Sequence, residues 1–381
     1  MRKKLIAKAK ALYRYAIAYL KNIYDHEILY NRGYAYAEKG DYDRAIEDFT
    51  AALKIKPSDR FTLYNRGNTY QNKGDYDRAI EDYTAALRIK PDDCFALNNR
   101  GLAYYNKGDF DRAIEDYNAD LRIKPNDCFA LNNRGVVYAN KGDYDRAIED
   151  YTAALKIKPN LYDTLYNRGF AYAEKGDYNR AIEDFTATLK IKPDDFVLYK
   201  RGYAYILKGD YDRAIEDFTA ALKIKPDDFV LFNRGYAYAE KGDYDRAIED
   251  YNAALRIEPN YTLALCFRGD AYYNKGDYDR AIEDYNAALR IEPNYTLALC
   301  FRGNAYYCKG DYDQAIEDYT AALRIKPDLY EALYNLGIAY AEKGDYDKAI
   351  DDFEAVLRID PNNAKAIENL EAIRKKIAEA K

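Results

Sequence analysis

The stretch Lys241–Gly269, KGDYDRAIEDYNAALRIEPNYTLALCFRG, decides the fold because it recurs without a single change as Lys275–Gly303. A looser form of the same stretch, marked by Lys-Gly-Asp followed by Tyr or Phe, occurs ten times among the 381 residues. The marker glycines are 33 or 34 residues apart: Gly40, Gly74, Gly108, Gly142, Gly176, Gly209, Gly242, Gly276, Gly310 and Gly344. A fixed period of this length is the signature of an array of small, similar structural units.

Each copy carries the signals of two helices. In the first copy, residues 26–38 place apolar and small side chains three and four positions apart, which lines one face of a helix. Gly40 then provides a helix end, and Asp41 is a favourable N-cap for a second helix. Pro57 prevents that second helix from continuing. The buried side of the second helix is predicted to carry Tyr42, Ala45, Ile46, Phe49, Ala52 and Leu53.

One such helical hairpin cannot cover its own apolar side, so neighbouring hairpins must stack on each other. Stacking of this kind produces an all-α solenoid. A hydrophobic content of 48% is enough to build that core and excludes a globally disordered chain.

The repeat also resembles a known family. The order Leu29, Gly33, Tyr36, Ala45, Phe49, Ala52 and Pro57 is similar to the tetratricopeptide repeat (TPR) pattern, spacing included. The resemblance extends from His26 to Asn363. It implies a right-handed superhelix whose first helices line a concave groove that binds peptides or protein segments.

The ends of the chain are predicted to cover the solenoid. Residues 1–25 carry Ala11, Tyr15 and Ala18 at the spacing of a second helix, and we interpret them as an N-terminal capping helix. Residues 26–363 form the ten repeats. Residues 364–381 imitate a first helix, with Glu371 in place of the packing glycine, and we interpret them as a C-terminal capping helix.

Arginine replaces the usual leucine before the packing glycine in nine copies, for example at Arg100, and only Leu336 breaks the row. An unpaired buried charge costs several kcal/mol, so a partner must recur with the same period. Asp does so in every copy, for example at Asp116. We therefore predict a structural ladder of Arg–Asp pairs between first and second helices.

The 44 tyrosines divide into two groups. Three positions of the repeat hold Tyr in almost every copy, and an aromatic stripe at helical spacing is usually core. Other tyrosines and phenylalanines fall on the opposite side of the first helices, where the resemblance places the groove. Phenylalanines at the start of the first helices, such as Phe61, fit repeat-to-repeat packing as well as a groove.

Asparagine recurs at one position of the same face, and its amide can grip a peptide backbone without reading its sequence. A hydrogen bond from each Asn to its own helix or to a neighbour is an equal alternative. The region beside the two 33-residue repeats is the favoured centre of binding. The predicted groove residues are Tyr64, Asn65, Asn99, Asn133, Tyr166, Asn167, Tyr199, Lys200, Tyr203, Phe232, Asn233, Tyr236, Asp270 and Tyr273.

Charge on this face is one-sided, since eight acidic residues stand against Lys200 alone, and this favours a basic or apolar partner segment. The Lys-rich clamp by which some TPR co-chaperones hold an acidic C-terminus is missing. A net charge of −6 argues against nucleic acid, and no apolar run is long enough for a membrane span. An odd set of five cysteines and an interrupted N-terminal apolar stretch lead us to expect a cytoplasmic protein.

No catalytic constellation is visible. His26 is the only histidine, the cysteines lack metal-binding spacing, and every glycine belongs to a turn or a packing site. We expect no enzyme activity, cofactor or metal. The leading hypothesis is a scaffold that holds an extended or helical segment of a partner in an aromatic, Asn-rich, mildly acidic groove. The alternative is a structural spacer or self-assembling repeat scaffold, natural or designed, that forms homo-oligomers and has no specific ligand.

Overall fold

The computed structural model describes residues 2–379, except for the side chains of residues 2–9, 18 and 19. The outermost residues of the two predicted caps, Met1 and residues 380–381, therefore lie outside the described part. All secondary structure in that part is helical. The helices are α1 Arg2–Glu38, α2 Tyr42–Ile55, α3 Arg60–Asn72, α4 Tyr76–Ile89, α5 Cys94–Asn106, α6 Phe110–Ile123, α7 Cys128–Asn140, α8 Tyr144–Ile157, α9 Tyr162–Glu174, α10 Tyr178–Ile191, α11 Asp195–Leu207, α12 Tyr211–Ile224, α13 Asp228–Glu240, α14 Tyr244–Ile257, α15 Thr262–Asn274, α16 Tyr278–Ile291, α17 Thr296–Cys308, α18 Tyr312–Ile325, α19 Tyr330–Lys343, α20 Tyr346–Ile359 and α21 Ala364–Glu379.

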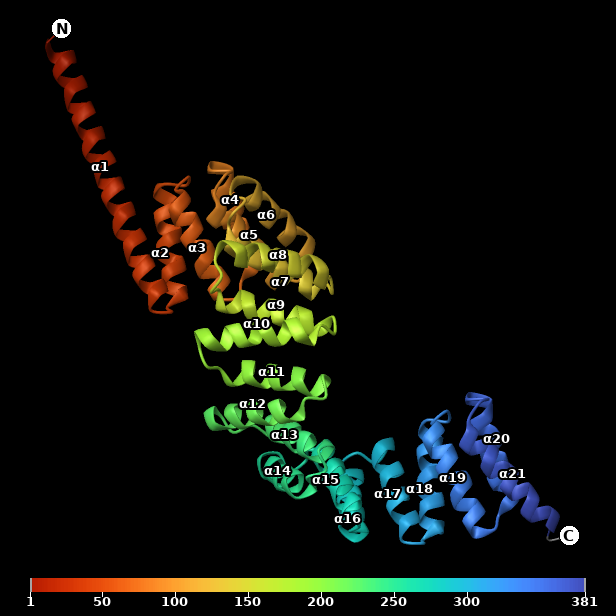
Figure 1. The fold of residues 1–381 in the computed structure, drawn as a ribbon. Coiled ribbons are helices and arrows are strands. Elements are labelled where there is room, and N and C mark those ends of the chain that lie inside the picture. Colours follow the sequence, from red (N-terminus) through yellow and green to blue (C-terminus); the bar gives the residue numbers. More distant parts are fainter. Residues whose placement is uncertain (1, 380–381) are drawn as a thin grey trace. The chain divides into compact units, whose positions relative to one another are not determined.

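The helices pair in chain order, α1 with α2, α3 with α4 and so on, and within residues 2–192 and within residues 193–379 each hairpin packs on the next (Figure 1). The chain consists of two compact units, Met1–Lys192 and Pro193–Lys381. Within each unit the odd-numbered helices are the first helices of the repeats and the even-numbered ones are the second helices. The predicted all-α solenoid of helical hairpins is confirmed.

Local backbone chemistry sets the hairpin. Gly74 ends the first helix of its repeat with φ +84°, a left-handed conformation that only glycine adopts without strain. Asp75 follows, and its carboxylate accepts a hydrogen bond from the backbone N–H of Arg78 at 3.2 Å, which caps α4. The two helices then approach closely at Gly67, where an added Cβ would lie 2.8 Å from Tyr83. The repeat therefore needs glycine at both places.

The predicted Arg–Asp ladder is confirmed, and it does more than join the two helices of one hairpin. Arg100 donates from Nε and Nη2 to the two oxygens of Asp116, at 2.8 and 2.7 Å. Its Nη1 donates to Thr84 Oγ1 of the preceding second helix at 3.0 Å. The guanidinium thus bridges three helices. Pairs of the same two-pronged form join Arg32 to Asp48, Arg66 to Asp82, Arg134 to Asp150, Arg168 to Asp184, Arg201 to Asp217, Arg234 to Asp250, Arg268 to Asp284 and Arg302 to Asp318.

The last repeat differs because Leu336 stands in the arginine position. Asp352 nevertheless remains, and its Oδ2 is buried without a hydrogen-bond partner. Burial raises the pKa of this carboxyl to about 7, and the charge of Asp351 adds to the effect. The ladder therefore ends in a carboxyl group, Asp352, that has no arginine partner.

The N-terminal end of the chain differs from the predicted separate cap. α1 is one helix of 37 residues that joins residues 2–25 to the first helix of the first repeat. No Gly or Pro precedes Gly33, so nothing in the sequence stops the helix. The described side chains between residues 10 and 24 are exposed, Tyr15 by 74% and Leu20 by 62%, and they cover no other helix.

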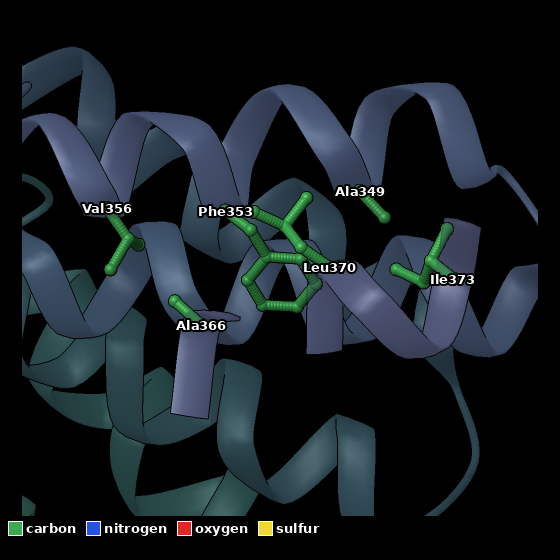
Figure 2. Close-up of a cluster of buried hydrophobic side chains, with 6 residues drawn as sticks. All are labelled: Ala349, Phe353, Val356, Ala366, Leu370 and Ile373. Carbon is green, nitrogen blue, oxygen red and sulfur yellow. The ribbon is translucent and has the colours of Figure 1, made fainter. Parts of the chain in front are cut away.

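At the other end, α21 packs on α20 and closes the second unit (Figure 2). The buried side chains at this contact come from both helices and are Ala349, Phe353, Val356, Ala366, Leu370 and Ile373. Leu370 is only 4% exposed. The exposed face of α21 carries charged residues, which suits the last helix of a solenoid.

Candidate functional site

All the predicted groove residues lie on the first helices of the repeats, and the side of these helices that they occupy is here called the first-helix face. Tyr64, Asn65, Asn99, Asn133, Tyr166 and Asn167 lie in the first unit, and the remainder lie in the second.

The two predicted groove tyrosines of the first unit, Tyr64 and Tyr166, are half-buried and take part in the fold. Tyr64 packs against the buried ring of Tyr83 in its own repeat, with ring centroids 5.9 Å apart. Tyr166 packs in the same way against Phe185. The phenol oxygen of Tyr64 also accepts a hydrogen bond from Asn99 at 2.7 Å. Each of these rings is thus fixed in place before any partner arrives.

The asparagines link consecutive first helices. Asn65 donates to Tyr30 at 2.8 Å, Asn133 donates to Asn98 at 2.8 Å, and Asn167 donates to Asn132 at 3.4 Å. Asn233 is buried and donates to the Phe229 carbonyl of its own helix at 2.7 Å. The structure therefore shows the alternative in which the amides bond within the fold. Each of these amides already donates one hydrogen bond within the fold. A bound peptide backbone could use only the donors and acceptors that these bonds leave over.

The predicted centre beside the shortened repeats contains two aromatic clusters. On α11, Tyr199 stacks between Phe196 and Tyr203, with centroid distances of 6.5 and 6.3 Å. The ammonium of Lys200 lies over the Phe196 ring. Tyr203 is 42% exposed and offers the free edge of this stack.

The second cluster joins α13 to α15. Phe232 and Tyr236 both pack against Phe267, at 5.3 and 5.9 Å between ring centroids. Phe267 stands where most repeats carry the asparagine. In this part of the chain an aromatic contact thus replaces the amide link between neighbouring repeats.

The phenylalanines at the starts of the first helices are exposed. Phe61, Phe95 and Phe129 are 58%, 76% and 61% exposed, so repeat-to-repeat packing is not their main role. Phe61, Phe95 and Tyr64 line a pocket of about 440 Å³, which the ion pair between Arg60 and Asp93 borders. A row of rings therefore borders the first-helix face in the first unit.

A smaller pocket of about 320 Å³ lies on the first-helix face of the second unit, between α15, α17 and α19. Its polar floor is a hydrogen-bonded group in which Asn304 Oδ1 accepts from Tyr319 at 2.7 Å and from Asn335 at 3.0 Å. Tyr307 and Ile338 form apolar walls. The Tyr273 hydroxyl and the exposed thiol of Cys308 are 3.2 Å apart at the rim.

Of the residues around this pocket, only Tyr273 belongs to the predicted groove set. Asn304, Cys308 and Ile338 occupy positions whose residue type changes from repeat to repeat, so periodicity gave no signal for them. Tyr319 occupies one of the three repeat positions that are predicted to be core, and it is buried, but its hydroxyl also reaches the pocket floor.

The described residues contain no cluster of His, Cys, Asp or Glu suited to a metal ion. In the same part of the chain, no helix is long and apolar enough to cross a membrane. The thiols of Cys266 and Cys300 are sheltered, and burial raises the pKa of Cys300 to about 11 and that of Cys266 to about 12. Neither thiol is thus an activated nucleophile.

The sequence matches three family models. Two are described as tetratricopeptide repeat, and they match residues 231–296 and 302–364, and residues 26–59, 61–93, 129–161, 162–195 and 196–228. The third, described as TPR repeat, matches residues 101–142. The chain belongs to the tetratricopeptide repeat family. No curated protein matches this TPR sequence at a significant level.

Solved structures share the TPR fold. The C-terminal part of a TPR repeat-containing protein from Cytophaga hutchinsonii is 22% identical, with a TM-score of 0.51, over 62% of this chain and 98% of that chain. A TPR protein from Parabacteroides merdae is 24% identical, with a TM-score of 0.49, over 63% and 96% of the two chains. YrrB, described as a TPR protein with an unusual peptide-binding site, is 22% identical, with a TM-score of 0.45, over 49% and 97%. At these levels of identity the similarity concerns the fold.

Proposed function

We propose that this TPR protein is a non-enzymatic scaffold that holds an extended or helical segment of a protein partner on its first-helix face. The observation that carries the proposal is the pocket between α15, α17 and α19. It combines the aromatic ring of Tyr307, the aliphatic side chain of Ile338 and the amide of Asn304 in about 320 Å³. Apolar walls with a few convergent polar groups are typical of a ligand site, and this volume suits one large side chain.

The free energy available from this pocket is too small to hold a partner segment by itself. Full burial of one apolar side chain contributes about 1.5–3 kcal/mol, whereas a micromolar complex needs about 8 kcal/mol. A partner segment must therefore contact further parts of the face. The exposed edge of Tyr203 and the acidic side chains of Glu240 on α13 and Asp270 on α15 are within the same unit and supply such contacts.

Peptide selection tests the proposal. A random dodecapeptide phage library is panned on the full chain, and the enriched peptides are measured by fluorescence anisotropy against the wild type and against Tyr307→Ala and Ile338→Ala. We expect each pocket variant to weaken binding at least fivefold. Ile325→Ala, which removes an exposed side chain at the end of a second helix, is the matched control and should change nothing. Equal affinities for all variants would remove the pocket from the proposal.

A second candidate function, self-assembly, is favoured by one observation. α1 exposes apolar side chains over several turns, including Leu12 (63%), Tyr13 (69%) and Leu20 (62%). Sedimentation velocity over a hundredfold concentration range separates the two functions. Growth of the particle that disappears in a Leu12→Glu, Tyr15→Glu, Leu20→Glu variant would favour assembly through α1, whereas a constant sedimentation coefficient would favour the peptide scaffold.

A further inference from the structure

Two carboxylates without a cation lie on the first-helix face of the second unit. Glu240 is at the C-terminal end of α13, and Asp270 is in the neighbouring first helix, α15. The two helices touch one turn before the two acids, where Tyr236 packs against Phe267 with 5.9 Å between ring centroids. Burial raises the pKa of Asp270, and the charge of Glu240 raises it further. In the described part of the chain neither forms an ion pair. Lys241 and Lys275, which follow these helices, pair instead with Asp212 and Asp245.

Neutral donors hold the two carboxylates in place. Tyr211 donates to Glu240 Oε2 at 3.3 Å, and Asn274 donates to Asp270 Oδ2 at 3.2 Å. Burial and the hydrogen-bonded Glu240 raise the pKa of Tyr236 to about 12, so this phenol stays protonated and neutral. These contacts orient the acids but leave both negative charges uncompensated.

A third observation concerns Tyr251, which is completely buried and whose hydroxyl has no hydrogen-bond partner. The equivalent hydroxyls of Tyr83 and Tyr319 donate to Asn68 and Asn304, each at 2.7 Å. In the repeat of Tyr251 the acceptor position is occupied by Tyr236 instead of an asparagine.

The unsatisfied hydroxyl of Tyr251 faces the position of Tyr236, because the equivalent hydroxyl of Tyr83 reaches Asn68 at that position of its repeat. After burial, the charge of Asp270 is the largest influence that raises the pKa of Tyr251, and Tyr236 and Glu240 contribute as well. Two carboxylates, a phenol and a buried hydroxyl without a partner thus converge on one place. A buried polar group left unpaired costs free energy, and this place therefore lacks a partner that is both positive and able to form hydrogen bonds.

We propose that Glu240, Asp270 and Tyr236 form a subsite for one basic side chain, Lys or Arg, of the bound segment. The subsite rests on the proposed function and specifies its partner. Its two carboxylates accept hydrogen bonds from the ammonium or guanidinium, and the Tyr236 ring can contact the cation through its face. Tyr273 lies one helical turn after Asp270 on α15 and also lines the 320 Å³ pocket. The basic residue of the bound segment therefore lies near the residue of the same segment that enters the pocket.

The chain contains a matched control for this proposal. The stretch that precedes Asp270 is repeated without change before Asn304, so Asp270→Asn gives one repeat the residue of the next. Asn304 accepts a hydrogen bond from Tyr319, and an asparagine at 270 can do the same for Tyr285. We therefore expect Asp270→Asn to fold normally. Glu240→Gln is the second variant, and Glu342→Gln, at the equivalent position of the last repeat, is its control.

The experiment uses n-butylammonium as a mimic of the lysine side chain and n-butanol as its neutral counterpart. Methyl-TROSY and amide NMR spectra of the full chain are recorded at increasing concentrations of each probe. We expect saturable shifts around Asp270 with butylammonium only, with at least fivefold weaker binding in Asp270→Asn and in Glu240→Gln and no change in Glu342→Gln. The carboxyl of Asp270 should also titrate at lower pH when butylammonium is bound.

Equal shifts from both probes, or undiminished butylammonium binding in Asp270→Asn and Glu240→Gln, would overturn the subsite. Its failure is distinguishable from failure of the scaffold. Selected peptides whose affinity depends on Tyr307 but not on Asp270 would leave the scaffold standing and remove the subsite. If the protein bound butylammonium but enriched no peptide, the subsite would stand and the scaffold function would be removed.

Discussion

Arg100 and Asp116 form a two-pronged ion pair across the two helices of one hairpin, while the third arm of the guanidinium reaches Thr84 of the hairpin before. The Asp116 side chain is 7% exposed and the Arg100 side chain is 19% exposed, so neither charge is well hydrated. The hydrogen bonds that Arg100 donates to Asp116 raise the pKa of Arg100 above its ordinary value, which keeps the guanidinium charged at every accessible pH.

This geometry predicts strong coupling between the two residues. Arg100→Leu and Asp116→Asn should each lower the free energy of unfolding by about 3 kcal/mol, because each leaves the other partner buried and unpaired. The double variant should lose less than the sum, by about 1–3 kcal/mol. The measurement is urea unfolding of all four proteins of the cycle, followed by circular dichroism. A sum of single effects that equals the double effect would show that the pair is not coupled.

The orphaned Asp352 predicts a repair. The position of Leu336 is flanked by the acceptors that an arginine needs, since Asp352 and Thr320 correspond to Asp116 and Thr84 of the intact ladder. Leu336→Arg should therefore raise the stability of the last repeat by about 1–2 kcal/mol, through hydrogen bonds to a carboxylate that now has a buried unpaired oxygen. Hydrogen exchange of the amides of α20 and α21 measures this. Leu333→Arg, a substitution elsewhere on the same helix, is the control and should not stabilise.

The same residue predicts a pH dependence. Because the folded pKa of Asp352, about 7, is above its ordinary value in the unfolded chain, the folded state binds more protons between roughly pH 4 and pH 7. The contribution of Asp352 to stability should therefore be present at low pH and disappear as pH rises through 7. Hydrogen exchange of α20 and α21, corrected for intrinsic rates, should show weaker protection at pH 8 than at pH 5.5. Asp352→Asn should abolish this difference.

Features that recur in all ten copies, or in nine of them, were predictable from the sequence. The hairpin, the packing of Gly67 on Tyr83 and the pairing of Arg100 with Asp116 all repeat with the period, and a repeated position reports one shared environment. The Arg–Asp pairing could be derived because a row of buried charges demands a partner at the same spacing. Its third arm, to Thr84, was missed because that position alternates between Thr and Asn.

Features that depend on one copy alone were not predictable. Tyr251 lacks a partner in a repeat that carries Tyr236 where Asn68 and Asn304 stand in two others. The pocket at Asn304 draws on three neighbouring repeats, two of which carry different residues, Asn304 and Ile338, at one position. The recurring asparagines were visible in the sequence, but an amide at this spacing can form hydrogen bonds with a neighbouring helix as well as with a ligand. Only the structure shows that Asn99 donates to Tyr64 and Asn133 donates to Asn98 on the preceding first helices.

Asp120 predicts a substitution that stabilises the protein by removing a buried carboxyl, whereas Leu336→Arg gives a buried carboxyl a partner. It is completely buried on the second helix α6, at a position where Ala52, Ala86 and Ala154 stand in other repeats. Its Oδ2 accepts a hydrogen bond from Asn98 at 2.9 Å, but its Oδ1 has no partner. Removing a buried carboxylate with an unsatisfied oxygen should recover about 1–3 kcal/mol, less the loss of one hydrogen bond. Asp120→Ala should therefore raise the urea midpoint of the first unit.

The matched control is the reverse exchange in another repeat. Ala86→Asp places the same carboxylate at the equivalent buried position of α4, where the preceding first helix α3 carries Tyr64 in place of Asn98. It should destabilise the protein by more than Asp120→Ala stabilises it, because no amide donor is positioned to receive the new charge. If Asp120→Ala lowered the midpoint instead, the bond to Asn98 would outweigh the buried unpaired oxygen, and Asp120 would count as part of the polar link between repeats.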